Sequence, residues 1–212
     1  MEYFKNNKQL IDYLGSKIFN HSEFTKITLM KEEFVITEYE KSQHLFFVTE
    51  GFLSVEVTKK QGSYISAFIF ENDLFGLDAF SSFPSKNHAI KVLSSIAIIY
   101  RIEKNFLLTS LNQRTNLYEL LLTNFTDVFQ RHYLFEDFLS LSTTERTKKS
   151  LSYLSDFIGE INEAGQIQTP MEVTQEVLAR FCRTSQSRIS VCLKELKESG
   201  FLLNRKAPFI LK

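Results

Sequence analysis

Several residue types are scarce in this sequence of 212 residues, which has no Trp, 7 Gly, 3 Pro and 2 Cys. So little Gly and Pro excludes a collagen-like or linker-rich chain. Two Cys cannot build a disulfide framework or a four-cysteine metal site. No run of about 18 apolar residues occurs, which argues against a transmembrane helix, and residues 1–8 lack the apolar core of a signal peptide. These absences predict a cytoplasmic protein with no membrane partner.

Apolar residues are plentiful, because 43% of the chain is hydrophobic and 21 residues are Phe, while 24% is charged. This is the balance of a globular protein. The formal net charge is zero, but residues 180–212 hold 8 basic residues against only Glu195 and Glu198, a local charge of +6. This excess predicts a polyanionic partner for the C-terminal end. The alternative is a solvated charged face.

The chain as far as about residue 110 predicts one helix at 8–18 followed by short strands. Residues 52–58 alternate between apolar and polar from Leu53 onward, the pattern of a half-buried strand. Turn-forming residues separate the apolar runs. Many short strands at this spacing favour an antiparallel β-roll, or jelly roll, over alternating strands and helices. We expect strands at 26–30, 33–37, 45–49, 52–58, 64–70, 88–93 and 97–102.

Residues 111–141 change to a helical period and predict one long helix. Its main apolar stripe recurs at steps of three and four, and a second apolar set, formed by Tyr118, Leu122, Phe129 and Tyr133, lies beside it. A helix that is apolar on more than one side favours packing on the β-roll and on a second subunit. The alternative is a core helix within a monomer. The candidate dimer-interface residues are Leu117, Leu121, Phe125, Val128, His132 and Phe135.

Residues 142–212 predict a helix-turn-helix followed by a basic hairpin. Ser142 and Glu145 fit a capping box, helices are expected at 174–182 and 185–199, and Gly200 ends the second helix. Strands at 201–203 and 209–211 then flank a basic turn. This order matches a winged helix-turn-helix. The expected fold class is therefore α+β, with an N-terminal antiparallel β-roll, a long dimerisation helix and a C-terminal winged helix-turn-helix.

The outward arc of the 185–199 helix is short, polar and basic, which suits DNA. Gln and Arg pair bidentately with adenine and guanine edges, so Gln186 and Arg188 are candidate base readers. Lys194, Arg205 and Lys206 are expected to contact phosphates. The alternative is an ordinary helical hairpin with a solvated surface. The candidate DNA-binding residues are Thr174, Thr184, Ser185, Gln186, Ser187, Arg188, Lys194, Arg205 and Lys206.

Three segments make the chain resemble the Crp/Fnr family of bacterial transcription regulators. Residues 45–55 resemble the family's barrel hairpin, residues 72–76 (Asn-Asp-Leu-Phe-Gly) resemble the turn that opens its effector cassette, and residues 174–196 resemble its helix-turn-helix. The resemblance implies a homodimer that binds a palindromic operator in double-stranded DNA, with RNA polymerase as a candidate partner. It also implies a sensor-like domain at 1–110, a dimerisation helix at 111–141 and a DNA-binding domain at 142–212.

The chain departs from the family's pattern at two places. Family members that bind cAMP carry a Glu directly after the cassette Gly and an Arg ten residues further, where this chain has Leu77 and Asn87. Leucine cannot accept a hydrogen bond from ribose and asparagine cannot neutralise a phosphate, so the resemblance implies a regulator that does not respond to cAMP. The alternative is another phosphorylated ligand, for which Asp78 would replace the Glu and Lys86 or Lys91 would supply the cation. Residues 186–191 differ from the family's common recognition helix and look closer to virulence-regulator-type members of low-GC Gram-positive bacteria.

Other chemistries have little support in the sequence. No cysteine precedes Cys182, which excludes the N-terminal iron–sulfur site of oxygen-sensing members. The four His are scattered, so no metal or cofactor is predicted, and Cys182 and Cys192 are expected to be structural. No nucleophile elbow or phosphate loop occurs, so we expect no enzyme. The remaining alternative to a DNA-binding regulator is a ligand-binding or protein-interaction module, and the effector stays unknown.

Overall fold

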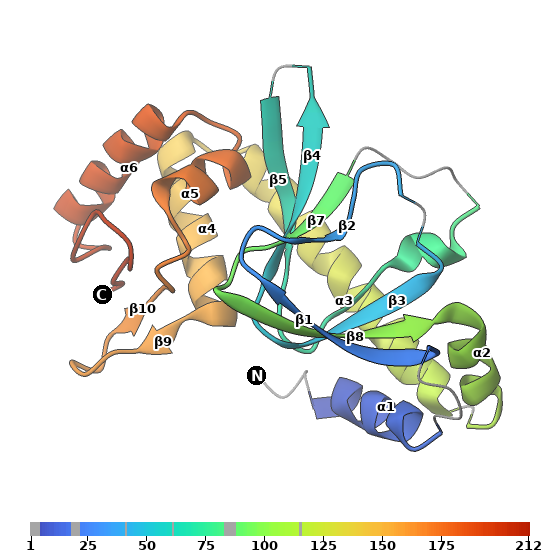
Figure 1. Cartoon of the computed structure of the whole chain (residues 1–212). Coiled ribbons are helices and arrows are strands. Elements are labelled where there is room, and N and C mark those ends of the chain that lie inside the picture. The colour runs from blue at the N-terminus through green and yellow to red at the C-terminus, as the bar shows by residue number, and fades with distance from the viewer. Residues whose placement is uncertain (1–4, 18–21, 41, 61, 83–87, 115) are drawn as a thin grey trace. The chain divides into compact units, whose positions relative to one another are not determined.

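The computed structural model describes residues 5–17, 22–40, 42–60, 62–82, 88–114 and 116–212 (Figure 1). The chain divides into two compact units. The first comprises Met1–Val55 with Phe68–Arg131, and the second comprises Glu56–Ala67 with His132–Lys212.

Two four-stranded sheets form the β-roll and confirm the predicted fold class. One sheet has the strand order β1-β8-β3-β6 and the other β2-β7-β4-β5. The two sheets stay separate and do not close into a barrel. Each predicted strand is present, and β6 is an additional one. The strands are β1 (Phe24–Met30), β2 (Phe34–Ile36), β3 (His44–Glu50), β4 (Leu53–Lys59), β5 (Gly62–Ile69), β6 (Leu74–Phe75), β7 (His88–Val92) and β8 (Ile96–Glu103).

Strand β3 is apolar on both faces because each face packs in a different core. Leu45 and Phe47 lie in a cluster with residues of the helices α1, α2 and α3. Phe46 and Val48 lie in a second cluster that draws on both sheets. Since successive side chains of a strand point to opposite faces, β3 is covered on both sides. A strand covered in this way is a continuous apolar run.

The helices of this part of the chain are α1 (Lys5–Gly15), the short 3-10 helix η2 (Leu77–Phe80), α2 (Lys104–Asn112) and α3 (Asn116–Leu139). The prediction of a single helix at 111–141 is wrong at its start, because α2 precedes α3. Helix α2 begins directly after β8, where the Glu103 carboxylate accepts a hydrogen bond from the Phe106 N–H at 2.7 Å. None of the described helices is long and apolar enough to cross a membrane.

The second unit contains the predicted helix-turn-helix. Ser142, Thr174 and Ser185 cap its three helices, and each side chain accepts a hydrogen bond from the N–H three residues later. The stacked rings of Phe135 and Phe181, with centroids 4.0 Å apart, join the end of α3 to this core. The elements are α4 (Thr143–Ile158), β9 (Glu160–Ile161), β10 (Ile167–Gln168), α5 (Gln175–Phe181) and α6 (Gln186–Glu198).

Residues 201–211, which we call the wing, turn back beside these helices. They form isolated bridges rather than the two regular strands that the sequence predicts. Leu202 pairs with Leu211, and Ile210 pairs with Gln168. Phe209 is fully buried and anchors the wing, because its N–H donates to the Thr169 hydroxyl at 3.0 Å.

Candidate nucleic-acid interface

Helix α6 has one buried face and one exposed face. Ile189, Cys192, Leu193 and Leu196 are at most 3% exposed and hold the helix against the core. Across the helix, Ser187, Arg188, Val191 and Lys194 are exposed. The outward arc expected from the sequence is therefore open, and among these four residues only Val191 is apolar.

The start of α6 presents the candidate base readers. The Ser185 hydroxyl accepts a hydrogen bond from the Arg188 N–H at 3.2 Å and lies 2.9 Å from the Ser187 hydroxyl. Gln186 and Arg188 are exposed, and no ion pair between described residues holds either side chain. Long side chains with free donors at the start of a helix can reach base edges in a major groove.

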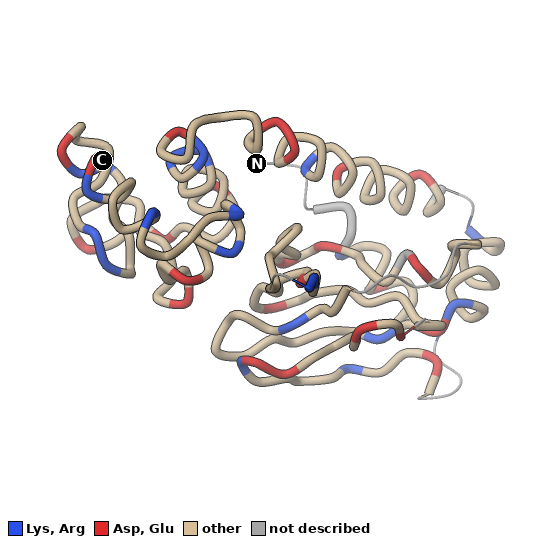
Figure 2. Tube along the Cα trace, turned by 90° about the horizontal axis from the view of Figure 1, so that it is seen from above, with Lys and Arg blue, Asp and Glu red and all other residues tan. Residues whose placement is uncertain are grey.

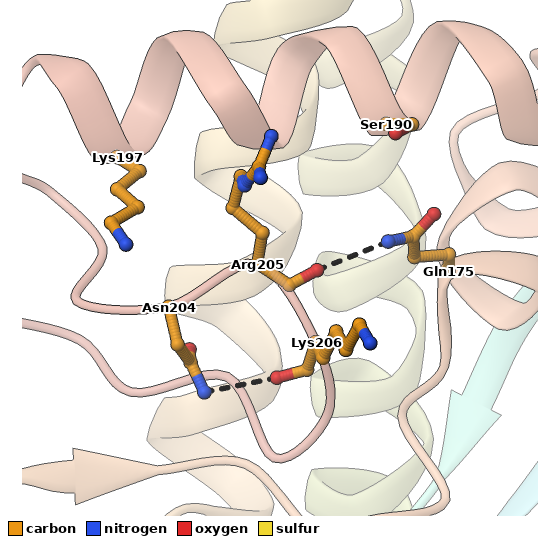
Figure 3. A pocket seen from close by; sticks show the side chains of 6 residues that line it. All are labelled: Gln175, Ser190, Lys197, Asn204, Arg205 and Lys206. Carbon is orange, nitrogen blue, oxygen red and sulfur yellow. Dashed lines mark hydrogen bonds between the residues drawn. The ribbon is translucent and has the colours of Figure 1, made fainter.

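A groove of about 410 Å³ lies between α5, α6 and the wing (Figure 3). Three of its lining residues are cations, Lys197, Arg205 and Lys206, and the Arg205 side chain extends toward α6. The described lining contains no carboxylate. Because like charges repel and nothing in the lining compensates them, the groove is suited to an anion. The complete lining is Gln175, Ser190, Lys197, Asn204, Arg205 and Lys206.

Ser190, Lys197, Asn204 and Gln175 are site residues that the sequence analysis missed. Ser190 and Lys197 are two turns apart on α6, a spacing that places both on one side of the helix. The sequence contains this spacing, but the spacing indicates a groove only once the position of the wing beside α6 is known.

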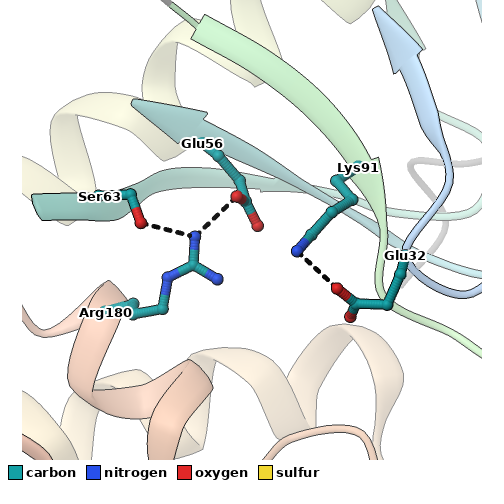
Figure 4. A network of polar contacts seen from close by, with 5 residues as sticks. All are labelled: Glu32, Glu56, Ser63, Lys91 and Arg180. Atoms are coloured by element: carbon teal, nitrogen blue, oxygen red, sulfur yellow. Dashed lines mark hydrogen bonds and ion pairs between the residues drawn. The ribbon is translucent and has the colours of Figure 1, made fainter. Parts of the chain in front are cut away.

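Two of the basic residues that give the C-terminal end its charge are already engaged. A guanidinium nitrogen of Arg180 lies 2.7 Å from a carboxylate oxygen of Glu56 and 3.4 Å from the Ser63 hydroxyl (Figure 4). The Arg183 guanidinium lies over the Tyr64 ring and 3.7 Å from the Glu136 carboxylate. All of these residues belong to the second unit. Both guanidinium groups therefore already contact other side chains of the second unit, which makes them less available to a polyanion.

The remaining charge of the second unit is mixed. Figure 2 shows basic and acidic residues interleaved along its trace. Lys194 lies 3.8 Å from Glu198 one turn later, and both side chains are exposed, so this pair is weak. The groove between α6 and the wing brings three cations together with no carboxylate among its described lining residues.

Helix α3 presents a different apolar face from the one predicted for dimerisation. Leu117, Leu121 and Phe135 are only 3%, 6% and 4% exposed, because residues of the same chain cover them. Phe125 packs partly against the core of the first unit, Val128 is half-buried and His132 is exposed.

The second apolar set is the open one. Leu122 is 63%, Phe129 56% and Tyr133 63% exposed. At 100° per residue these three positions fall within about 40° of arc on the helix. We call them the outer face of α3.

Two residues that the sequence analysis considered for a phosphorylated ligand, Asp78 and Lys91, are each paired with another residue. A carboxylate oxygen of Asp78 in η2 lies 3.2 Å from the His88 ring nitrogen. Lys91, considered above as a cation for a ligand, lies 2.8 Å from the Glu32 carboxylate (Figure 4). Lys86 and Asn87 lie outside the described residues. The described residues include no group of three or more His, Cys, Asp or Glu that could hold a metal.

The turn before η2 is tied to α3 by a buried ion pair. The Asp73 carboxylate accepts a hydrogen bond from the Phe70 N–H and lies 2.8 Å from the Arg131 guanidinium. Burial raises the pKa of Asp73, and the Arg131 cation opposes that shift. Gly76 ends the turn with a φ of +87°, and a Cβ there would lie 2.7 Å from the His44 carbonyl oxygen, so only glycine fits.

Both cysteines are free thiols buried in the helix-turn-helix core. Burial raises the pKa of the Cys182 thiol. A protonated, inaccessible thiol is a poor nucleophile, which agrees with the structural role expected from the sequence.

Comparison with solved structures finds full-length relatives. A cyclic nucleotide-binding domain containing protein from Listeria monocytogenes is 36% identical, with a TM-score of 0.86 over 98% of this chain and 97% of that chain. The chain belongs to the same family as this cyclic nucleotide-binding domain containing protein. No protein-family model and no curated protein matches the sequence.

More distant solved structures, both of regulators, share the fold. A CRP-family transcriptional regulator from Thermus thermophilus is 16% identical, with a TM-score of 0.70 over 87% of this chain and 90% of that one. The c-di-GMP responsive global regulator CLP of Xanthomonas campestris is 15% identical, with a TM-score of 0.74 over 96% and 98%.

Proposed function

We propose that this chain is a sequence-specific DNA-binding transcription regulator of the Crp/Fnr family. The observation that carries the proposal is the pairing of an exposed polar face on α6 with a cationic groove that lacks a carboxylate in its described lining. The first suits base edges and the second suits phosphates. The regulatory function of the structural neighbours supports the same assignment. A DNA-binding regulator of this kind acts in the cytoplasm, with RNA polymerase as a further partner, and has no enzymatic activity.

We assign three roles to three consecutive parts of the chain. The part of the chain before about residue 110 acts as a sensor-like domain, the segment 111–141 supplies the dimerisation helix as α3 (Asn116–Leu139), and 142–212 acts as the DNA-binding domain. The Listeria relative supports a kinship with regulators of low-GC Gram-positive bacteria.

The homodimer forms through the outer face of α3. Leu122, Phe129 and Tyr133 leave more than half of their surface open, and a run of apolar residues at helical spacing is the pattern of a helix–helix seam. Two copies related by a two-fold axis would each present an α6 to the major groove. The half-sites of the palindromic operator then lie about 10 bp apart, centre to centre.

The regulator does not respond to cAMP. Leu77 stands where a carboxylate would hold the ribose, and Asp78 is already beside His88. No cofactor is needed for the proposed DNA binding, and the effector is left open.

The test separates base reading from phosphate contact. Arg188→Ala removes a candidate base reader at the start of α6, so we expect a loss of about 1–3 kcal/mol on the operator and little loss on scrambled duplex. Lys206→Ala removes a phosphate contact, so it should weaken both duplexes alike and flatten the salt slope by about one unit per monomer. Binding is measured on both duplexes across a salt series.

Two results would overturn the proposal. Binding of the parent protein that does not depend on salt would favour a protein-interaction module. Unchanged specificity in alanine variants of all of Ser185, Gln186, Ser187 and Arg188 would show that α6 does not read bases. Equal losses on both duplexes for Arg188→Ala alone would make Arg188 a phosphate contact and leave base reading to the other three.

A further inference from the structure

We propose that Gln175 is a positioning residue for the cations of the wing. Gln175 is the first residue of α5, and its side-chain amide donates a hydrogen bond to the Arg205 backbone carbonyl at 3.0 Å (Figure 3). This bond fixes the wing backbone at the residue whose side chain enters the groove. The inference rests on the proposed DNA binding and adds a residue whose action on DNA is indirect.

The wing is held from two directions. Asn204 organises it internally, because its amide nitrogen donates to the carbonyls of Pro208 at 2.6 Å and Lys206 at 3.0 Å, and its amide oxygen accepts from the Ile210 N–H at 3.0 Å. Gln175 instead joins the tip of the wing to a different element. The first set of bonds gives the wing its shape, and the second sets its place beside α6.

The position of the wing decides whether its cations act together. Lys197, Arg205 and Lys206 line one groove, and their mutual repulsion favours a wing that moves away from α6. A hydrogen bond to the Arg205 carbonyl opposes that movement without using any charge of the groove. The cations are therefore already gathered before a phosphate arrives, which lowers the entropy lost on binding.

A direct contact between Gln175 and DNA predicts a different energetic pattern. Gln175 is half-buried in the groove lining, so its amide could also donate to a phosphate. A direct contact adds to the contacts of the wing independently. A positioning role exists only while the wing carries cations to position, so the two effects are not additive.

The experiment is a double-mutant cycle with Gln175→Met, which keeps the length of the side chain and removes its donor. Four proteins are titrated on one operator duplex across a salt series: the parent, Gln175→Met, Arg205→Ala/Lys206→Ala, and the triple variant. We expect Gln175→Met to weaken binding of the parent about three- to tenfold for each DNA-bound protomer, the range of one hydrogen bond. Its salt slope should match the parent, because the number of phosphates contacted is unchanged. In the variant without wing cations the same change should have almost no effect.

Controls keep the result interpretable. Gln9 lies on the exposed side of α1. Gln9→Met is the control for replacing a Gln by Met away from the groove, and it should leave DNA binding unchanged. If Gln175→Met lowers the thermal midpoint, the cycle is repeated with Gln175→Asn, which keeps an amide one methylene too short to reach the carbonyl.

The outcomes are distinct. An equal loss in both backgrounds would overturn the positioning role and make Gln175 a direct contact, and no loss in either would also overturn it. A parent protein that does not bind DNA would instead contradict the proposed function.

Discussion

Truncation of Phe129 to alanine should separate the proposed dimer into monomers. Phe129 is 56% exposed in a single chain, and an aromatic side chain that is fully buried covers about 200 Å². Roughly 110 Å² is then left for a partner, and at about 25 cal/mol per Å² its burial contributes about 3 kcal/mol in each copy. In a two-fold dimer both copies lose this contact. After allowing for the area that alanine retains, we expect a loss of about 4 kcal/mol, or a dimer dissociation constant about a thousandfold weaker.

Sedimentation equilibrium measures this dissociation constant directly, and Leu134→Ala is the matched control. Leu134 is 46% exposed on the same helix, but it lies about 120° around the axis from Leu122 at 100° per residue. The control should therefore leave the dimer intact. A Phe129→Ala dimer as tight as the parent, or a Leu134→Ala variant that dissociates equally, would refute the assignment of the outer face.

Two further predictions concern the first unit. Titration calorimetry with millimolar cAMP should give no saturable heat, because Asp78 is already 3.2 Å from His88 and no carboxylate stands at Leu77; a micromolar dissociation constant would contradict this. Burial, with the Arg101 cation, lowers the pKa of His44. The resulting stabilisation is complete above the ordinary histidine pKa of about 6.5 and is lost as the pH falls through the lower folded-state value. The free energy of unfolding, measured in urea, should therefore fall less on acidification for His44→Gln than for the parent. Equal falls in the two proteins would refute the role of His44.

Most of the β-roll could be predicted because its signals are local. Short apolar runs separated by turn-forming residues mark the strands of more than two residues. Strand β6 was missed because two residues carry no period, and it exists only through pairing with β3, where Phe75 lies opposite Phe46. Helix α2 was missed because Glu103 both ends β8 and caps the helix, which leaves no loop between them to mark a boundary.

The helical period of α3 was predicted correctly, but the sequence did not show that Leu117 and Leu121, placed in the candidate dimer interface, are buried within the chain itself. Leu117 and Leu121 are as apolar as Leu122 and Phe129, so the sequence offers two equivalent stripes. Which stripe packs on the chain itself depends on the tertiary core, where Leu117 and Leu121 meet residues of α1 and α2. Helical spacing alone contains no such information.

The candidate nucleic-acid interface could also be predicted only in part from the sequence. The polar arc of α6 follows from helical spacing, and the structure leaves it exposed as expected. The groove does not follow, because Lys197 meets Arg205 only where the wing returns to α6. The bond that Gln175 makes is to a backbone carbonyl, and a partner of that kind leaves no mark in the sequence.

Selection from a pool of random-sequence duplexes tests the central claim, that the protein reads DNA sequence as a dimer. The parent protein is incubated with the pool, bound duplexes are recovered and amplified over several rounds, and the enriched sequences are determined. The account predicts one two-fold symmetric motif with half-sites about 10 bp apart, and loss of that motif with Phe129→Ala. A pool that shows no enriched motif, or an enriched motif without symmetry that Phe129→Ala leaves unchanged, would contradict it.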